Sequence, residues 1–174
     1  AVIIVVTNTL DVMVWTAHKF SGFSKNKGIG MAGELDSARC RYELALLKDK
    51  DANKLRAKIV GAHNDEMIVS ASNISENLNE NELKALKKET STGGAKIVKL
   101  LGTSAYYAPA AAAVKMCEMI VGKSDEIISA SVLIDDELSC GRLVRLGREG
   151  LEEILELNLS ENEQEQLSKS EAEI

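Results

Sequence analysis

The sequence predicts an α/β fold, and two observations support this. Residues 2–6 form an uninterrupted β-branched run that is apolar on both faces, as strands buried inside a parallel sheet are. Further along the chain, segments with apolar residues at helical spacing alternate with short apolar runs of strand length. A buried strand needs neighbours, so we expect residues 2–6 to belong to a sheet of a larger α/β fold.

The first half of the chain divides into predicted elements by periodicity. Apolar positions at helical spacing predict helices over residues 10–20 and 35–48, with a polar loop over residues 24–27. Apolar runs predict strands over residues 54–60 and 67–71. A stretch rich in Asn, Ser and Glu, residues 73–82, predicts a solvated loop.

The second half continues the alternation. Helical spacing predicts helices over residues 82–101 and 110–121, the second of them started by Pro109. Residues 126–134 and 141–146 read as paired strands, and residues 151–159 as a strand or as a short helix followed by a strand. Ser160 and Glu163 have the spacing of a capping box, which predicts a final polar helix to Ile174.

A glycine pair interrupts the long helix predicted over residues 82–101. Gly93 and Gly94 each cost about 1 kcal/mol relative to alanine in a helix interior. Such a cost needs a compensating reason. We therefore expect a close packing contact or a bend at this pair.

Composition excludes several classes of function. The 174 residues are 45% hydrophobic and carry a net charge of −6, without a basic cluster interleaved with aromatics. This argues against a nucleic-acid partner. The longest aliphatic run is far shorter than the roughly 20 residues that cross a bilayer, so we expect no membrane partner.

Cys40, Cys117 and Cys140 lie far apart, which predicts no disulfide framework, no metal site and a cytoplasmic location.

The segment from Gly28 to Gly33 matches the G-x-G-x-x-G pattern of dinucleotide-binding turns. That pattern functions only where a buried strand leads into the first glycine and a helix N-terminus follows. Here the polar residues 24–27 precede it. We therefore expect a structural turn ahead of the helix that contains Asp36, with no pyrophosphate bound to it.

Three residues carry a stronger chemical signal. Asp36 and Arg39 are three residues apart on a predicted helix and so share one face, although spacing alone favours a surface ion pair. His63 follows an apolar strand, where catalytic residues are often found, and it can exchange a proton near neutral pH. A carboxylate on its second ring nitrogen would fix the tautomer, and Asp36 is the candidate. His18 lies in a helix without a surrounding motif and is interpreted as structural.

Taken together, the motifs resemble those of the malate/lactate dehydrogenase family. The resemblance extends from residue 1 to about residue 170, with the motifs in family order. They are residues 5–8, 10–13, 35–39, 61–65, 93–94, 97–98, 100–102 and 104–110. The last group leans towards the malate-type branch.

The resemblance implies a role for five residues. His63 is implied as the proton donor and acceptor, with Asp36 orienting its imidazole. Arg39 is implied to hold the substrate carboxylate through two parallel hydrogen bonds. Asn8 is implied to contact the substrate oxygen or the nicotinamide, and Ser104 to line the substrate pocket.

The resemblance also implies a domain organisation and a partner set. Residues 1–20 are implied as the remnant of the nucleotide-binding (Rossmann) domain, with only the last part of its sheet, and residues 21–174 as the α+β substrate-binding domain. NAD is the implied cofactor, a 2-hydroxy or 2-oxo dicarboxylate the implied ligand, and a homo-oligomer, dimer or tetramer, the implied assembly. The implied function is malate oxidation, and the isolated chain is expected to be nearly inactive.

Two alternatives stay open at this stage. L-lactate or another 2-hydroxy acid is possible because Arg39 recognises only the carboxylate that these substrates share. A truncated, non-catalytic oligomerisation or regulatory module is favoured by departures from the family pattern. Thr9 replaces a usual proline, and the loops after Asp65 and over residues 135–145 are short. Asn64 replaces a usual glycine, which is tolerable if the backbone is left-handed there, because asparagine enters that region more readily than other non-glycine residues.

Overall fold

The computed structural model describes all 174 residues. The helices are α1 (Leu10–Ser21), α2 (Gly33–Lys48), α3 (Glu80–Leu101), α4 (Tyr107–Ile120) and α5 (Glu161–Ala172), with the 3-10 turns η1 (Lys25–Lys27) and η2 (Ala52–Lys54). The strands are β1 (Ile3–Val5), β2 (Gly28–Gly30), β3 (Ala57–Val60), β4 (Ile68–Ile74), β5 (Ile128–Leu133), β6 (Ser139–Gly147) and β7 (Gly150–Ile154). The predicted helices are all present, with ends shifted by at most three residues.

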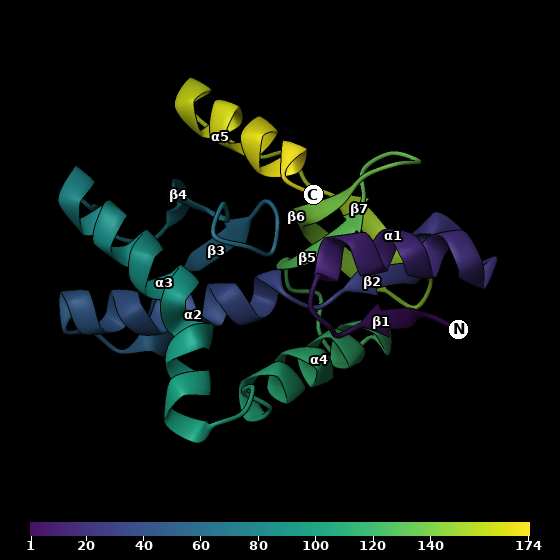
Figure 1. Cartoon of the computed structure of the whole chain (residues 1–174), viewed down its shortest axis with the longest axis horizontal. Coiled ribbons are helices and arrows are strands. Elements are labelled where there is room, and N and C mark those ends of the chain that lie inside the picture. The colour runs from purple at the N-terminus through teal and green to yellow at the C-terminus, as the bar shows by residue number, and fades with distance from the viewer.

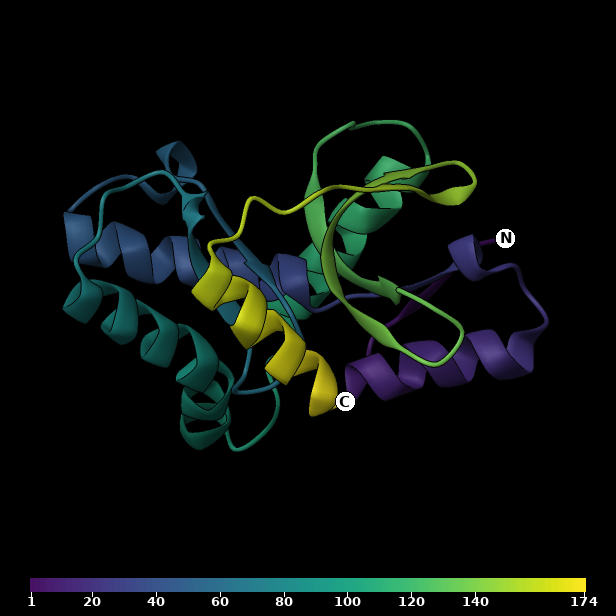
Figure 2. The same cartoon turned by 90° about the horizontal axis from the view of Figure 1, so that it is seen from above.

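A five-stranded sheet in the order β1-β2-β5-β6-β7 forms one part of the molecule (Figure 1). β1 and β2 are parallel, whereas β2, β5, β6 and β7 pair antiparallel. Helices α1 and α4 lie on opposite faces of this sheet (Figure 2). The predicted α/β class is confirmed, and the sheet is mixed.

The expectation of a buried first strand is only partly correct. β1 pairs in parallel, as the sequence predicted, but within this chain it is the edge strand of the sheet. Its residues are half-buried, and Val6 directly after it is 50% exposed. A segment that is apolar on both faces is therefore less buried in this chain than its sequence pattern predicts.

The turn expected at Gly28 to Gly33 is wrong, because Gly28–Gly30 forms the buried strand β2 and α2 begins at Gly33. A Cβ added to Gly30 would lie 2.5 Å from Val14 Cγ2 and 2.8 Å from Ser131 Cβ. The glycine therefore permits α1 to pack closely on the sheet. Because β2 has only one apolar side chain in three residues, its sequence shows no hydrophobic alternation from which a strand could be predicted.

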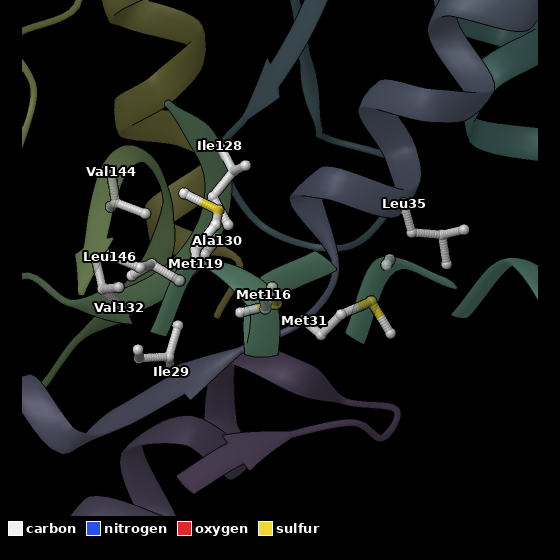
Figure 3. Packing of buried hydrophobic residues seen from close by; sticks show 11 residues of the cluster. Ile29, Met31, Leu35, Met116, Met119, Ile128, Ala130, Val132, Val144 and Leu146 are labelled. Atoms are coloured by element: carbon white, nitrogen blue, oxygen red, sulfur yellow. The ribbon is translucent and has the colours of Figure 1, made fainter. Parts of the chain in front are cut away.

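The largest core lies between the sheet and α4 (Figure 3). Alternate residues of β5, namely Ile128, Ala130 and Val132, face α4 and pack with Met116 and Met119. The two serines between them point to the opposite face, as the two-residue period of a strand requires. There Ser131 contacts Asp11 of α1, and Ser129 contacts Ile59 of β3. The full set is Ile29, Met31, Leu35, Ala112, Met116, Met119, Ile128, Ala130, Val132, Val144 and Leu146.

A second core lies where α2 and α3 cover the two-stranded β3–β4 sheet (Figure 1). Helix α2 contributes to both cores. Its Leu35 packs in the first, whereas Cys40 and Leu44 pack in the second. The part of α2 between these residues, which includes Asp36 and Arg39, therefore lies at the junction of the two cores.

Both of the short loops form closed turns. The β3–β4 connection is closed by the Met67 N–H, which donates to the Asn64 carbonyl at 3.2 Å. The β5–β6 hairpin is closed by the Ile134 N–H, which donates to the Leu138 carbonyl at 2.8 Å. None of the helices has both the length and the apolar character needed to cross a membrane.

Candidate active site

The main chain that leads into His63 is held by three contacts. Gly61 exchanges two hydrogen bonds with Gly141 of β6, at 3.0 and 3.1 Å. The Ala62 N–H donates to Ser170 Oγ of α5 at 2.9 Å. Gly61 has a φ of +89°, and a Cβ there would lie 2.9 Å from Ser170 Oγ, so glycine is needed on both counts. These contacts fix the chain immediately before His63.

His63 and Asp36 form the hydrogen-bonded pair that the sequence suggested. Nδ1 of His63 lies 2.7 Å from Oδ2 of Asp36. Asp36 is in the first turn of α2, where the helix dipole favours a negative charge, and its side chain is 2% exposed. The buried carboxylate holds the proton on Nδ1, which leaves Nε2 as the ring nitrogen available to a ligand.

The surroundings of His63 favour its protonated form. Burial of the imidazole and the positive charge of Arg39 both disfavour the protonated form. The hydrogen bond to Asp36 and the negative charges of Asp36 and Asp11 favour the protonated form and outweigh these two effects. The pKa of His63 is therefore raised above its usual value of 6.5. At neutral pH, such a group can exchange a proton in either direction.

Arg39 adds a cation to the same pair. Its Nη1 donates to Oδ1 of Asp36 at 3.1 Å, and its side chain is 19% exposed. The guanidinium lies against Gly93 and Gly94 of α3, where added Cβ atoms would be 3.5 Å from Arg39 atoms. The glycine pair does contact another element, but at ordinary van der Waals distances that would also admit alanine. The surface ion pair that spacing alone favoured is wrong, because the partner carboxylate is buried.

All five residues singled out in the sequence line one cavity of about 480 Å³. His63, Asp36 and Arg39 form a connected group within it, as described above. Asn8 comes from the segment after β1, and Ser104 from the α3–α4 connection. Both are exposed, and neither side chain hydrogen-bonds to the other three residues. Residues from four parts of the chain thus meet around one space.

The cavity combines charge recognition with an apolar wall. Met31, Leu35, Met67 and Val98 supply apolar surface beside the Arg39 guanidinium. A small ligand with a carboxylate could therefore bind to the cation while its carbon atoms pack against these side chains. His63 lines the same cavity, so the imidazole and the guanidinium border one ligand space.

Asn64 adopts a different backbone from the one considered for it. A left-handed conformation would have explained an asparagine at a position where glycine is usual. The only non-glycine residue with positive φ is Asp49, so Asn64 has ordinary backbone geometry. Its Oδ1 instead accepts the Glu66 N–H at 2.8 Å, an Asx turn that shapes the short loop.

Sequence reasoning missed the contribution of Asp11. Its carboxylate accepts the main-chain N–H of His63 at 2.8 Å and the Ser131 hydroxyl at 2.6 Å. Asp11 lies 52 residues from His63 in the chain, so spacing gives no indication of the contact. The only available signal was an acidic residue that lies, in the sequence, between the apolar Leu10 and Val12.

No group of three or more His, Cys, Asp or Glu residues in the chain is placed to hold a metal ion. The site supplies three groups from its own side chains. It combines a proton-exchanging imidazole, the carboxylate that orients it and a guanidinium for an anionic ligand.

Comparison with known families gives a match over most of the chain. Residues 33–174 match the family described as "lactate/malate dehydrogenase, alpha/beta C-terminal domain". Among curated proteins, the chain is 41% identical over 179 residues to a "Probable malate dehydrogenase" of Campylobacter jejuni, covering 96% of this chain and 59% of that protein. The chain thus spans less than two thirds of the length of this relative.

Solved structures show the same similarity. The malate dehydrogenase of Salinibacter ruber superimposes with a TM-score of 0.93 at 35% identity, covering 99% of this chain and 60% of the other. The lactate dehydrogenase of Cryptosporidium parvum superimposes with a TM-score of 0.92 at 32% identity, covering 99% of this chain and 63% of the other. Both likenesses extend over the whole candidate site.

Proposed function

Because this chain belongs to the lactate/malate dehydrogenase family, we propose that it is the substrate-binding and catalytic half of an NAD-dependent malate dehydrogenase. One observation carries the proposal. A buried carboxylate orients His63 and also contacts Arg39, and all three side chains line a single cavity. This is the arrangement that proton transfer at a carboxylate-bearing substrate requires.

His63 is the proposed general base for malate oxidation. Its Nε2 takes the proton of the C2 hydroxyl, whose oxygen becomes the ketone oxygen, and NAD, when bound, would be the acceptor of the hydride that leaves C2. Asp36 holds the imidazole and stabilises the imidazolium that results. In the reverse direction, the same imidazolium returns the proton to the oxygen.

Arg39 is the proposed anchor for the carboxylate next to the reacting carbon. Its guanidinium presents paired N–H donors whose geometry matches a carboxylate, which lysine cannot reproduce. The contact with Asp36 and the surface of Gly93 and Gly94 fix its orientation before substrate arrives. Asn8 and Ser104 are proposed to add contacts to the substrate oxygens, Asn8 also to the nicotinamide.

The residues after β1 fit the nicotinamide end of NAD. Val6, Thr7 and Asn8 are exposed, line the cavity that contains His63, and follow the carboxyl end of a parallel strand, where α/β sheets bind nucleotides. When bound, NAD supplies the hydride-accepting chemistry. By contrast, the strand Gly28–Gly30 is buried and presents no loop to a pyrophosphate.

We propose a domain division on the same grounds. Residues 1–20 would belong to the nucleotide-binding half and residues 21–174 to the substrate-binding half. The family match begins at residue 33, and β1 leaves one edge unpaired. Residues 1–174 alone would then lack most of the surface that holds NAD against the substrate carbon.

The test compares this chain with a hybrid. In the hybrid, the amino-terminal part of the Campylobacter jejuni relative precedes residues 1–174. We expect the 174-residue chain alone neither to bind NAD tightly nor to oxidise malate, and the hybrid to do both. Positioning of the reactants contributes roughly 7 to 11 kcal/mol to such reactions, and the chain alone does not supply it. Calorimetric NAD titration and steady-state malate oxidation measure the two properties.

A substitution in the hybrid tests the role of His63. His63→Asn keeps a polar side chain but removes the titrating group, and we expect malate oxidation to fall by about a hundredfold or more. Circular dichroism controls for folding. Rapid malate oxidation by the 174-residue chain alone, or full activity in the His63→Asn hybrid, would refute the proposal.

A second candidate substrate is L-lactate or another 2-hydroxy acid. The likeness to a lactate dehydrogenase at a TM-score of 0.92 supports keeping it, because Arg39 addresses only the shared carboxylate. The ratio of kcat/KM for malate and lactate in the hybrid discriminates between them. We expect malate to be preferred, since the first curated relative is a probable malate dehydrogenase.

We also propose a homo-oligomer in a reducing cytoplasm. An exposed apolar stripe on α4, which includes Val114 and Val121 just beyond its end, supports association. All three cysteines are unpaired, which supports the compartment. Sedimentation of the hybrid showing only monomer at high concentration would argue against the assembly.

A non-catalytic module, the remaining alternative, predicts an assembled hybrid without any malate oxidation.

A further inference from the structure

Asp11 is a buried carboxylate that contacts the site from outside the cavity. It lies in the first turn of α1, its residue is 6% exposed, and it is not among the cavity-lining residues. Its Oδ2 accepts the main-chain N–H of His63 at 2.8 Å, and its Oδ1 accepts the Ser131 hydroxyl at 2.6 Å. Asp11 therefore acts on His63 without reaching a ligand of the cavity.

The same residue links two further elements, β5 and β6, to the segment of His63. Ser131 belongs to β5, and the Ser139 hydroxyl of β6 donates to the Asp11 carbonyl. Both serines are buried. The glycine at position 30 lets α1 come close enough for these contacts, because a Cβ there would collide with Val14. Asp11 is thus a fixed point between α1, the sheet and the loop that carries His63.

Asp11 has no cationic partner, although its carboxylate is buried. It makes none of the ion pairs in the chain, and its contacts are to a peptide N–H and to hydroxyl groups. The amino-terminal end of α1 favours its charge. The negative charge of Asp11 is therefore not neutralised locally, and it acts on the neighbouring imidazole.

We propose that Asp11 is a positioning residue for His63, which fixes the main chain of the histidine and places a second negative charge beside its imidazole. The importance of Asp11 for catalysis rests on the proposed function of His63. The effect of Asp11 on the protonation of His63 does not depend on that function. The charged side chains around His63 are Asp36 and Arg39 from α2, Asp11 from α1, and Asp65, which lines the same cavity. From β6 and α5, Arg142 and Glu171 pair with each other.

The effect of the charge is measured by NMR titration of the 174-residue chain. The chain contains two histidines, so the imidazole signals of His63 and His18 can be assigned with a His18→Gln variant. Asp11→Asn removes the charge with little change in shape. We expect the pKa of His63 to fall by roughly half a unit, and by more in Asp36→Asn, which removes the charge of the carboxylate that bonds directly to the imidazole.

Asp49→Asn is the matched control. Asp49 is exposed at the far end of α2, with a left-handed backbone that asparagine adopts readily. It should leave the pKa of His63 unchanged. A pKa of His63 that is the same in Asp11→Asn as in the unmodified chain would overturn the role of the charge.

The effect on the main chain is measured by hydrogen exchange of the His63 amide. Asp11→Ala removes the acceptor and should accelerate exchange at least about tenfold, whereas Asp11→Asn retains an amide oxygen and should accelerate it less. Equal exchange in the unmodified chain and in Asp11→Ala would overturn the role in fixing the main chain.

If these variants do not fold, the unmodified chain still allows a test, which is NMR of the Asp11 carboxyl carbon as a function of pH. The Asp11 carboxyl carbon should show a chemical-shift step at the pKa of His63, because the imidazolium charge acts on the carboxylate. A titration curve without that step would contradict the proposal. Neither malate nor NAD is present in these experiments. A lowered pKa in Asp11→Asn together with an inactive hybrid would retain the role of Asp11 and reject the proposed function.

Discussion

At the scale of single residues, Arg39 depends on the absence of side chains opposite it. Its guanidinium faces Gly94 of α3, where an added Cβ would lie 3.5 Å from Nη2 and 3.6 Å from Nη1. These are ordinary contact distances, so alanine fits at position 94. A larger, branched side chain would extend beyond Cβ into the space of the guanidinium.

The first prediction compares two substitutions of this glycine. Gly94→Ala should leave Arg39 in place and stabilise α3 by up to about 1 kcal/mol, because alanine favours helix. Gly94→Val should displace the guanidinium, so KM for malate in the hybrid rises about tenfold or more while unfolding remains cooperative. Urea denaturation and steady-state kinetics measure both effects. Equal KM values in the two variants would contradict the role of the glycine surface.

The second prediction concerns the pH dependence of stability. The pKa of His63 is raised in the folded chain above its usual 6.5, so the folded state binds the proton more tightly than the unfolded state. The stabilisation is fully present below pH 6.5 and is lost as pH rises through the folded pKa. Urea denaturation of the chain and of His63→Asn should therefore differ more at pH 5.5 than at pH 8.5. A difference independent of pH would contradict the pairing.

The residues of the site were predictable to different degrees, for physical reasons. Spacing alone favoured a surface ion pair for Asp36 and Arg39. The position of His63 after an apolar strand suggested that Asp36 is its partner, and the resemblance to a known family gave all three residues their roles. The sequence did not predict Asp11, because its partner is a main-chain N–H in a distant segment. A main-chain donor has no residue identity, so no pattern of side chains can reveal such a contact.

At the scale of elements, hydrophobic periodicity identified the helices and most strands. It failed for β2, which was expected to be a turn. Two of its three residues are glycines, and one of them, Gly30, is required by the close approach of α1 rather than by burial of a side chain. The pattern also placed β1 in the interior of a sheet, although it is an edge strand here. The hydrophobic period of a segment shows which of its faces are apolar, but it does not show which other elements pack against those faces.

The third prediction concerns Glu34, a buried carboxylate that joins three elements. Glu34, in the first turn of α2, is 3% exposed. It lies 3.0 Å from Lys115 of α4, 3.4 Å from Arg41 of α2 and 3.6 Å from Lys58 of β3. Burial lowers the pKa of Lys58 although Glu34 opposes it. Arg41 and Lys58 form ion pairs with this carboxylate alone, whereas Lys115 has a second partner in Glu126 at 2.9 Å.

Glu34→Gln should lower the free energy of unfolding by about 2 kcal/mol or more, because it leaves three partly buried cations without their shared partner. Glu165→Gln is the control, since Glu165 and Lys169 form an ion pair in which both side chains are 68% exposed. That change should cost less than about 1 kcal/mol. Urea denaturation of both variants decides, and equal losses would contradict the structural role of Glu34.

At the scale of the whole molecule, the site lies where two cores meet. Helix α2 leaves the sheet at Gly33 and packs first against α4 and then against β3, so Asp36 and Arg39 lie between the two cores. His63 reaches the same place because Gly61 pairs with Gly141 of the large sheet. The sequence predicted the elements but not this junction, which depends on contacts between segments far apart in the chain.

The central claim is that His63 transfers the proton and Asp36 orients it. The measurement that tests it most directly is the pH profile of kcat/KM for malate oxidation in the hybrid, with and without Asp36→Asn. We predict that the rate rises with pH through one ionisation above pH 6.5, because the base must be neutral and its pKa is raised. Asp36→Asn should move that ionisation to lower pH and reduce the plateau at least about tenfold. An ionisation that does not move, together with an unchanged plateau, would contradict the account.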